Sequence, residues 1–196
     1  MNYLGVDLAS RCSSYVLLDS AGKVQAQGDS YGISEKDFVS RLIQYGKLEE
    51  KSATETIVAI EDLPHRIPYR ISVKEVCRLQ GRIVQQADSY GTLPRIMFVQ
   101  PAVWQRSFEG VWKGGANGAR NAAEELNFFA PDLVGDGSHV PFHNLKGKER
   151  TKLRKTAKKL MTDYNDAFLL AYWAKKTWEE HGTLMIGAVQ QYHTGV

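Results

Sequence analysis

The sequence predicts an α/β fold in which a five-stranded mixed sheet is flanked by helices, and two observations predict it. Three short apolar segments between Asn2 and Gly28 are joined by links of a few residues, which is typical of an antiparallel meander. Beyond them helical and strand-like segments alternate, which favours crossover connections and parallel strands. The 196 residues suit one domain with its own core.

The first half of the chain contains the meander and one helix. We expect strands over residues 2–10, 14–19 and 23–28, the last two joined by a short turn. Ser34 to Asp37 resembles a capping box, and the apolar spacing after it indicates an amphipathic helix that ends near Gly46. This helix leads from the meander to the next strand.

The middle of the chain alternates strands with helices. Residues 56–60 are nearly all β-branched or apolar, as in a strand buried on both faces. Residues 72–75 form a second capping-box pattern, which opens a long helix that should stop before Gly91. Residues 94–99 predict a fifth strand, and Pro101 favours the first turn of a short helix.

The last third is less regular. Glycines make much of 110–147 an expected loop, with a helix over 121–129. Residues 149–160 have helix-forming composition, and a separate helix, apolar on almost every side, is expected over 163–174. The segment 183–189 suits a strand or an extended arm. We therefore expect one domain, residues 1–196, with a basic insertion at roughly 110–160.

Composition excludes several classes of protein. With 43% hydrophobic and 24% charged residues the chain is globular, and no apolar run reaches the length of a membrane span. The N-terminus lacks a signal-peptide pattern. Cys12 and Cys77 predict neither a disulfide framework nor a metal or redox motif. We expect a reducing, cytoplasmic location.

One segment concentrates positive charge. Residues 146–159 contain eight basic residues and one acid, a net charge of +7, whereas the whole chain carries +3 and the remainder therefore −4. This distribution suggests a polyanionic partner. The alternative interpretation of this segment is a helix face that is basic only because it is exposed to solvent. The basic residues are Lys146, Lys148, Arg150, Lys152, Arg154, Lys155, Lys158 and Lys159.

Acidic residues stand at the boundaries of three apolar segments. Asp7 and Glu61 end expected strands, and Asp163 and Asp166 share one face of a helix. Each has a structural alternative, because an aspartate can close a turn and acids are favoured at a helix N-terminus. If all four converge, their repulsion requires neutralising cations, and Mg²⁺ prefers such oxygen ligands.

Five segments in this order resemble a known family. They resemble the ribonuclease H-like fold, in particular the RuvC family of Holliday-junction resolvases, with the bacteriophage versions nearest in style. The segments are Gly5-Val6-Asp7-Leu8-Ala9, Ala59-Ile60-Glu61-Asp62, Leu79-Gln80-Gly81, Val99-Gln100-Pro101-Ala102-Val103-Trp104 and Asp163-Tyr164-Asn165-Asp166-Ala167-Phe168-Leu169-Leu170-Ala171.

The resemblance implies a structure-selective DNA endonuclease that cuts Holliday junctions or related branched DNA by two-metal-ion hydrolysis. Asp7, Glu61, Asp163 and Asp166 would be the catalytic metal ligands, with Asp7 bridging two Mg²⁺ ions, for which Mn²⁺ is a possible substitute. A four-way junction is two-fold symmetric, so a homodimer is expected. Its interface would involve the helix from Val73 or the region of Trp173 and Trp178. A phage-encoded enzyme would act in the host cytoplasm.

Basic residues supply the expected DNA contacts, although the basic segment has no counterpart that can be mapped onto the family. The expected DNA-binding residues are Arg66, Tyr69, Arg70, Lys113, Arg150, Lys152, Arg154, Lys155, Lys158 and Lys159. Some family members place a base-contacting aromatic where this chain has Pro64, and Tyr69 and His65 are the candidates to replace it. Two alternatives share the fold: a nuclease for flaps, forks or RNA–DNA hybrids, and a non-catalytic nucleic-acid-binding module. An actin-like ATPase is excluded, because it needs a second similar domain.

Overall fold

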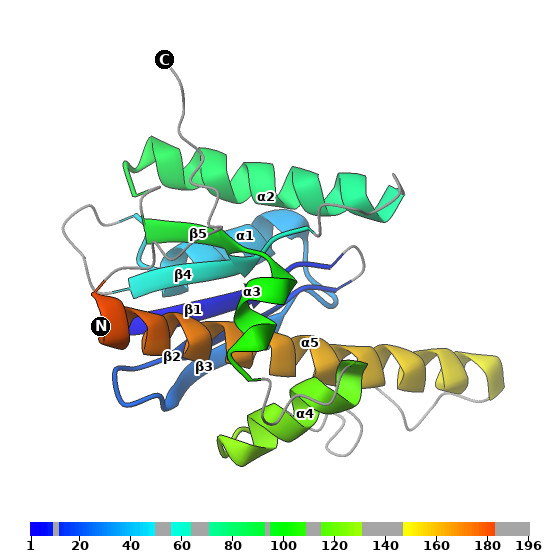
Figure 1. Ribbon diagram of the computed structural model, residues 1–196. Coiled ribbons are helices and arrows are strands. Elements are labelled where there is room, and N and C mark those ends of the chain that lie inside the picture. Colours follow the sequence, from blue (N-terminus) through cyan, green and yellow to red (C-terminus); the bar gives the residue numbers. More distant parts are fainter. Residues whose placement is uncertain are drawn as a thin grey trace.

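The computed structural model describes residues 1–9, 12–49, 56–63, 71–92, 95–108, 115–130 and 147–182. Figure 1 shows a central sheet between two layers of helices. The strands are β1 (Asn2–Asp7), β2 (Ser14–Leu18), β3 (Val24–Asp29), β4 (Thr56–Glu61) and β5 (Ile96–Val99). The helices are α1 (Glu35–Tyr45), α2 (Ile71–Ser89), α3 (Pro101–Arg106), α4 (Gly115–Glu125) and α5 (Gly147–His181). Within these ranges no helix has the length and hydrophobicity needed to span a membrane.

The sheet has the strand order β3-β2-β1-β4-β5, with β1 in the centre. β1, β2 and β3 pair antiparallel, whereas β1 and β4, and β4 and β5, pair parallel. The predicted fold class, a meander followed by parallel strands in a five-stranded mixed sheet, is therefore confirmed.

The two faces of the sheet form two cores. Leu4 and Val6 pack with α1 and α2 on one face, and Tyr3 packs with α3, α4 and α5 on the other. Side chains alternate along a strand, so Gly5 and Asp7 point to the same face as Tyr3. The end of β1 therefore presents its carboxylate toward α5.

Gly5 lets α5 lie directly on β1. A Cβ atom at Gly5 would overlap the carbonyl oxygen of Ala167 and lie 2.5 Å from the amide nitrogen of Ala171. Ala167 and Ala171 are one turn apart and completely buried, so the helix presents two small side chains at this point. The contact fixes where α5 sits along β1.

α5 differs from the sequence prediction. It is one continuous helix of 35 residues, whereas the sequence suggested a basic helix followed by a separate one beginning at Asp163. Residues 160–163 contain no proline or glycine, so nothing breaks the helix there. The change in composition marks instead where the helix meets the sheet, since its first half extends beyond the sheet (Figure 1).

Three other helix boundaries test the sequence patterns. The Ser34 cap is confirmed, because its Oγ accepts a hydrogen bond from the Asp37 N–H at 3.1 Å. The second capping box is wrong, because Ser72 lies inside α2.

α4 covers Gly115–Glu125 rather than the expected 121–129. Its buried alanines pack in the same core as α5. The helix ends before Asn127, whose φ of 59° is not helical. The segment 183–189 lies outside the described residues.

The contact at Gly5 predicts opposite effects for the same substitution at two glycines. Gly5→Ala should lower the free energy of unfolding by about 3 kcal/mol or more, because the backbone of α5 cannot yield as a side chain would. Gly81→Ala, on the exposed side of α2 with no atom within 4 Å of the new methyl, should raise it by about 0.5–1 kcal/mol. Urea unfolding measures both, and equal effects would contradict the close packing.

Candidate active site

Asp7 and Glu61 lie at the same edge of the sheet and on the same face. Asp7 ends β1 and Glu61 ends β4, and the parallel register pairs Val6 with Ile60 just before them. Adjacent strands are about 4.8 Å apart. Ala59 packs on the α5 face, so Glu61, two residues later, points there as well.

α5 brings Asp163 to this edge. The helix runs antiparallel to β1, because Lys175 approaches the β2–β3 turn near the start of β1 whereas Ala167 lies on Gly5. Asp7 lies two residues beyond Gly5, about 7 Å along the strand. Asp163 lies one turn before Ala167, about 6 Å along the helix axis. The two carboxylates are therefore displaced from the Gly5 contact by similar amounts in the same direction.

The acidic side chains of the site are largely covered. Asp7 is 8% and Asp163 4% exposed, and Glu61 and Asp166 are half-buried. Asp163 lies 16 residues after Gly147, the first residue of α5. The helix macrodipole stabilises acids only within the first turn of a helix. The alternative explanation, that Asp163 and Asp166 stabilise a helix N-terminus, is therefore wrong.

A hydrogen-bond network connects α5 to the end of β3. The Tyr164 hydroxyl donates to Asp29 Oδ2 at 2.8 Å, and the Tyr31 N–H donates to Asp29 Oδ1 at 2.7 Å. Burial, followed by the charge of Asp29, raises the pKa of Tyr164 above its ordinary value. The phenol therefore stays protonated and donates, which fixes the rotation of α5 beside Asp163.

Cys12 lies next to this network as a neutral group. Burial raises the pKa of its thiol to about 12; a hydrogen bond from Ser30 opposes the shift, and the charges of Asp29 and Asp163 add to it. The thiol is thus protonated at neutral pH and adds no negative charge beside Asp163.

Glu61 is held by a residue that sequence reasoning did not assign a role. Trp104 Nε1 donates to Glu61 Oε2 at 3.2 Å, and Trp104 is fully buried. Asp29, Tyr164 and Trp104 carried no spacing signal toward the acidic residues, because their contacts depend on the folded register and are separated by up to 135 positions in sequence.

The donor chemistry of the four acidic side chains fits a hard divalent cation, which takes carboxylate oxygens. Within the described part of the chain, no three His, Cys, Asp or Glu side chains are grouped closely enough to hold a metal ion. Cation binding would require the carboxylates to turn toward a common point. The metal-ligand assignment of Asp7, Glu61, Asp163 and Asp166 stays a prediction.

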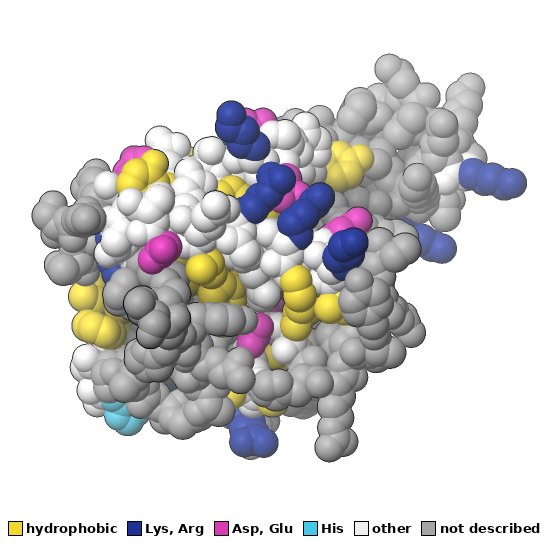
Figure 2. All heavy atoms as spheres, turned by 90° about the horizontal axis from the view of Figure 1, so that it is seen from above, with side chains coloured by type: hydrophobic (Ala, Val, Ile, Leu, Met, Phe, Trp, Pro, Cys, Tyr) yellow, Lys and Arg dark blue, Asp and Glu magenta, His cyan; other side chains and the backbone are white. Residues whose placement is uncertain are grey.

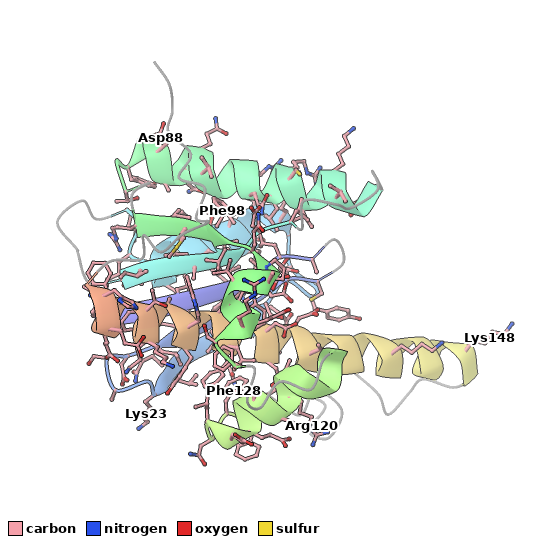
Figure 3. The ribbon with its side chains drawn as sticks, viewed as in Figure 1. Lys23, Asp88, Phe98, Arg120, Phe128 and Lys148 are labelled. Atoms are coloured by element: carbon pink, nitrogen blue, oxygen red, sulfur yellow. The ribbon has the colours of Figure 1, made fainter. Side chains whose placement is uncertain are left out.

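The expected DNA contacts are only partly within view. Arg66, Tyr69, Arg70 and Lys113, together with Pro64 and His65, lie outside the described residues. α5 contains five more of the expected contacts, whose side chains lie outside the described part of the structure: Arg150, Lys152, Arg154, Lys158 and Lys159. Lys148 and Lys155 are exposed, and Lys148 lies at the end of α5 that extends away from the sheet (Figure 3).

The opposite helical layer does not offer a uniformly basic surface. Figure 2 shows basic and acidic side chains close together on the face that includes α2. Arg78 and Arg82 both bind Glu35, with nitrogen–oxygen distances of 2.5 and 3.0 Å. Positive charge on this face is therefore partly neutralised.

One of the two suggested dimer interfaces does not fit the packing. Trp173 is 4% exposed and lies inside the core between the sheet and α5, and Trp178 packs against that core. Trp173 is therefore not available to a partner chain.

Comparison with known proteins identifies similar structures but no similar sequence. No protein-family model matches the chain, and no curated protein matches it. RuvC of Thermus thermophilus in complex with a Holliday junction substrate superposes with a TM-score of 0.53 at 12% identity, over 92% of this chain and 96% of that one. A second Thermus thermophilus RuvC structure superposes with a TM-score of 0.50 at 14% identity, over 93% of this chain and 98% of that one. The chain therefore has a RuvC-like, ribonuclease H-like fold; these likenesses do not bear on the expected phage type.

Proposed function

We propose that this protein is a metal-dependent endonuclease that cuts Holliday junctions or related branched DNA by hydrolysing phosphodiester bonds. One observation supports the proposal: Asp7 and Glu61 end adjacent parallel strands on the sheet face that α5 covers, and the contact of α5 with Gly5 displaces Asp163 toward the same ends of the strands. Further support comes from the fold, which is similar to that of a RuvC solved with a Holliday junction substrate.

The four carboxylates would hold two Mg²⁺ ions, or Mn²⁺ in their place. When bound, such a pair activates a water molecule and stabilises the leaving oxygen. Asp7, on the central strand, is our choice for the ligand shared by both ions, with Glu61 and Asp166 completing the set and Asp163 ligating or orienting water. The burial of Asp7 and Asp163 lowers the local dielectric, which strengthens their attraction for cations.

The basic first half of α5 would bind the DNA backbone. It belongs to the same helix as Asp163 and Asp166, so a phosphate held there has a fixed distance to the site. Contacts with phosphates set affinity and register without reading sequence. A symmetric dimer would present two such sites to a four-way junction.

The substrate class is tested by comparing cleavage of a four-way junction, a replication fork, a flap and an RNA–DNA hybrid in Mg²⁺ or Mn²⁺. Preferential, paired cuts in the four-way junction support the proposal. Preferential cleavage of a flap, a fork or the hybrid would make the protein a nuclease of the same fold with another substrate. Binding without cleavage of any of them would make it a non-catalytic module.

We predict that Asp7→Asn and Asp166→Asn each reduce junction cleavage in Mg²⁺ to the uncatalysed level while leaving the dissociation constant for DNA nearly unchanged. Each substitution removes one negative charge from the site and keeps the side-chain volume. Asp88→Asn, on the exposed side of α2, is the matched control and should cut like wild type. Normal cleavage by either site variant would refute the assignment.

We further predict that the double variant Lys155→Glu, Lys159→Glu weakens binding to every DNA structure. The slope of log K against log salt should become shallower by about 2, because each lost phosphate contact contributes about 0.9. The control is Lys74→Glu, Lys176→Glu, which makes the same charge change at exposed positions on α2 and on the far half of α5. Equal slopes for the two double variants would show that the basic segment is only a solvated helix face.

A further inference from the structure

The carboxylate of Glu61 is held by an uncharged donor. Trp104 donates its indole Nε1–H to Glu61 Oε2 at 3.2 Å, and it is fully buried in the core cluster that it shares with residues of α5. Phe108 packs edge-on against the indole, with ring centroids 6.4 Å apart and planes at 71°. The indole therefore has little freedom to turn away from the carboxylate.

The backbone places Trp104 at this position. Glu61 and Val99 are paired in the parallel register of β4 and β5, and the Asp62 N–H donates to the Val99 carbonyl at 2.8 Å. Gln100 then occupies the N-cap position of α3, and Pro101 occupies its first position. Trp104 follows within one helical turn, so a strand pairing and a proline-initiated helix together set the indole over the end of β4.

A second contact supports Glu61 from the other face of the sheet. Gln80 on α2 is buried, and its Nε2 lies 3.5 Å from both the Glu61 carbonyl oxygen and Asp62 Oδ1. These are long hydrogen bonds. The backbone of Glu61 is thus approached from the α2 side and its carboxylate from the α3 side.

The type of donor decides what the contact can do. Indole is a neutral donor with no acceptor function, so it accompanies a carboxylate without cancelling its charge. An arginine or lysine at this position would orient the carboxylate but would also neutralise it. The hydrogen bond from indole to Oε2 therefore orients the carboxylate without placing a positive charge beside it.

We propose that Trp104 is a positioning residue, whose indole N–H keeps the Glu61 carboxylate on the α5 face of the sheet, from which it would bind a divalent cation. This inference rests on the proposed function, because it needs Glu61 to be a metal ligand. Partners of ligating groups commonly contribute 10–100-fold in metal affinity, roughly, by fixing ligand orientation. The competing view is that the bond only satisfies a buried N–H.

The first test observes the indole directly. The chain has four tryptophans, so ¹⁵N-labelled protein should show at most four indole N–H resonances, and Trp104→Phe identifies one by its loss. We expect that resonance to shift as Mg²⁺ is added, and Glu61→Gln to abolish the shift. A Trp104 resonance that stays in place while Mg²⁺ binds would overturn the inference.

The second test measures Mn²⁺ affinity of the full chain by calorimetry. Trp104→Phe keeps an aromatic ring and removes the N–H, and should weaken binding about 10–100-fold. Phe38→Leu changes buried packing in the core on the opposite face of the sheet, away from Trp104, so it should lower stability but leave Mn²⁺ affinity unchanged. If Trp104→Phe does not fold, benzothienylalanine at position 104 replaces the N–H with sulfur in a ring of similar shape and should show the same loss. Wild-type affinity in the folded variant would overturn the inference.

The outcomes separate this inference from the proposed function. Weakened Mn²⁺ binding in Trp104→Phe, together with no cleavage of any DNA by wild type, supports the positioning role and refutes the nuclease. Active cleavage with an unchanged Mg²⁺ dependence in Trp104→Phe supports the nuclease and refutes the positioning role. Absence of Mn²⁺ binding by wild type refutes both.

Discussion

The contact between Gly5 and α5 is the constraint on which the rest of the structure depends. Any side chain at position 5 would collide with the backbone of α5 at Ala167 and Ala171, so the helix can lie this close only over a glycine. The same contact sets the position of α5 along β1. It determines that the acidic turn of α5, and not a neighbouring turn, lies beside the end of β1. The contact at Gly5 therefore determines both how α5 packs on the sheet and which of its residues lie at the candidate site.

This arrangement places charge where a protein optimised for stability alone would place apolar groups. Asp7 and Asp163 are nearly covered, and buried like charges repel in a medium of low dielectric. Three uncharged groups lie close to these acidic residues. Trp104 donates a hydrogen bond to Glu61, and Tyr164 donates one to Asp29. The Cys12 thiol, with its pKa raised to about 12, stays protonated. These three neighbours therefore order the site without adding a charge to it.

The strands, their mixed pairing and the acidic residues at their ends were predictable, because apolar patterns and turn residues act locally. Two features were not. The continuity of α5 was missed because its composition changes near residue 160 without a helix-breaking residue, and only the position of the sheet explains the change. The roles of Trp104 and Asp29 were missed because each depends on contacts between distant segments, such as the register that pairs Glu61 with Val99.

The central claim is that carboxylates from β1, β4 and α5 act as one cation site. Anomalous diffraction from crystals of the protein soaked in Mn²⁺ tests it most directly, because the signal locates the metal independently of activity. The account predicts anomalous density for two ions bounded by Asp7, Glu61, Asp163 and Asp166, roughly 3.5–4 Å apart. Well-ordered crystals with no density at this edge of the sheet, or with Mn²⁺ bound only elsewhere, would contradict it.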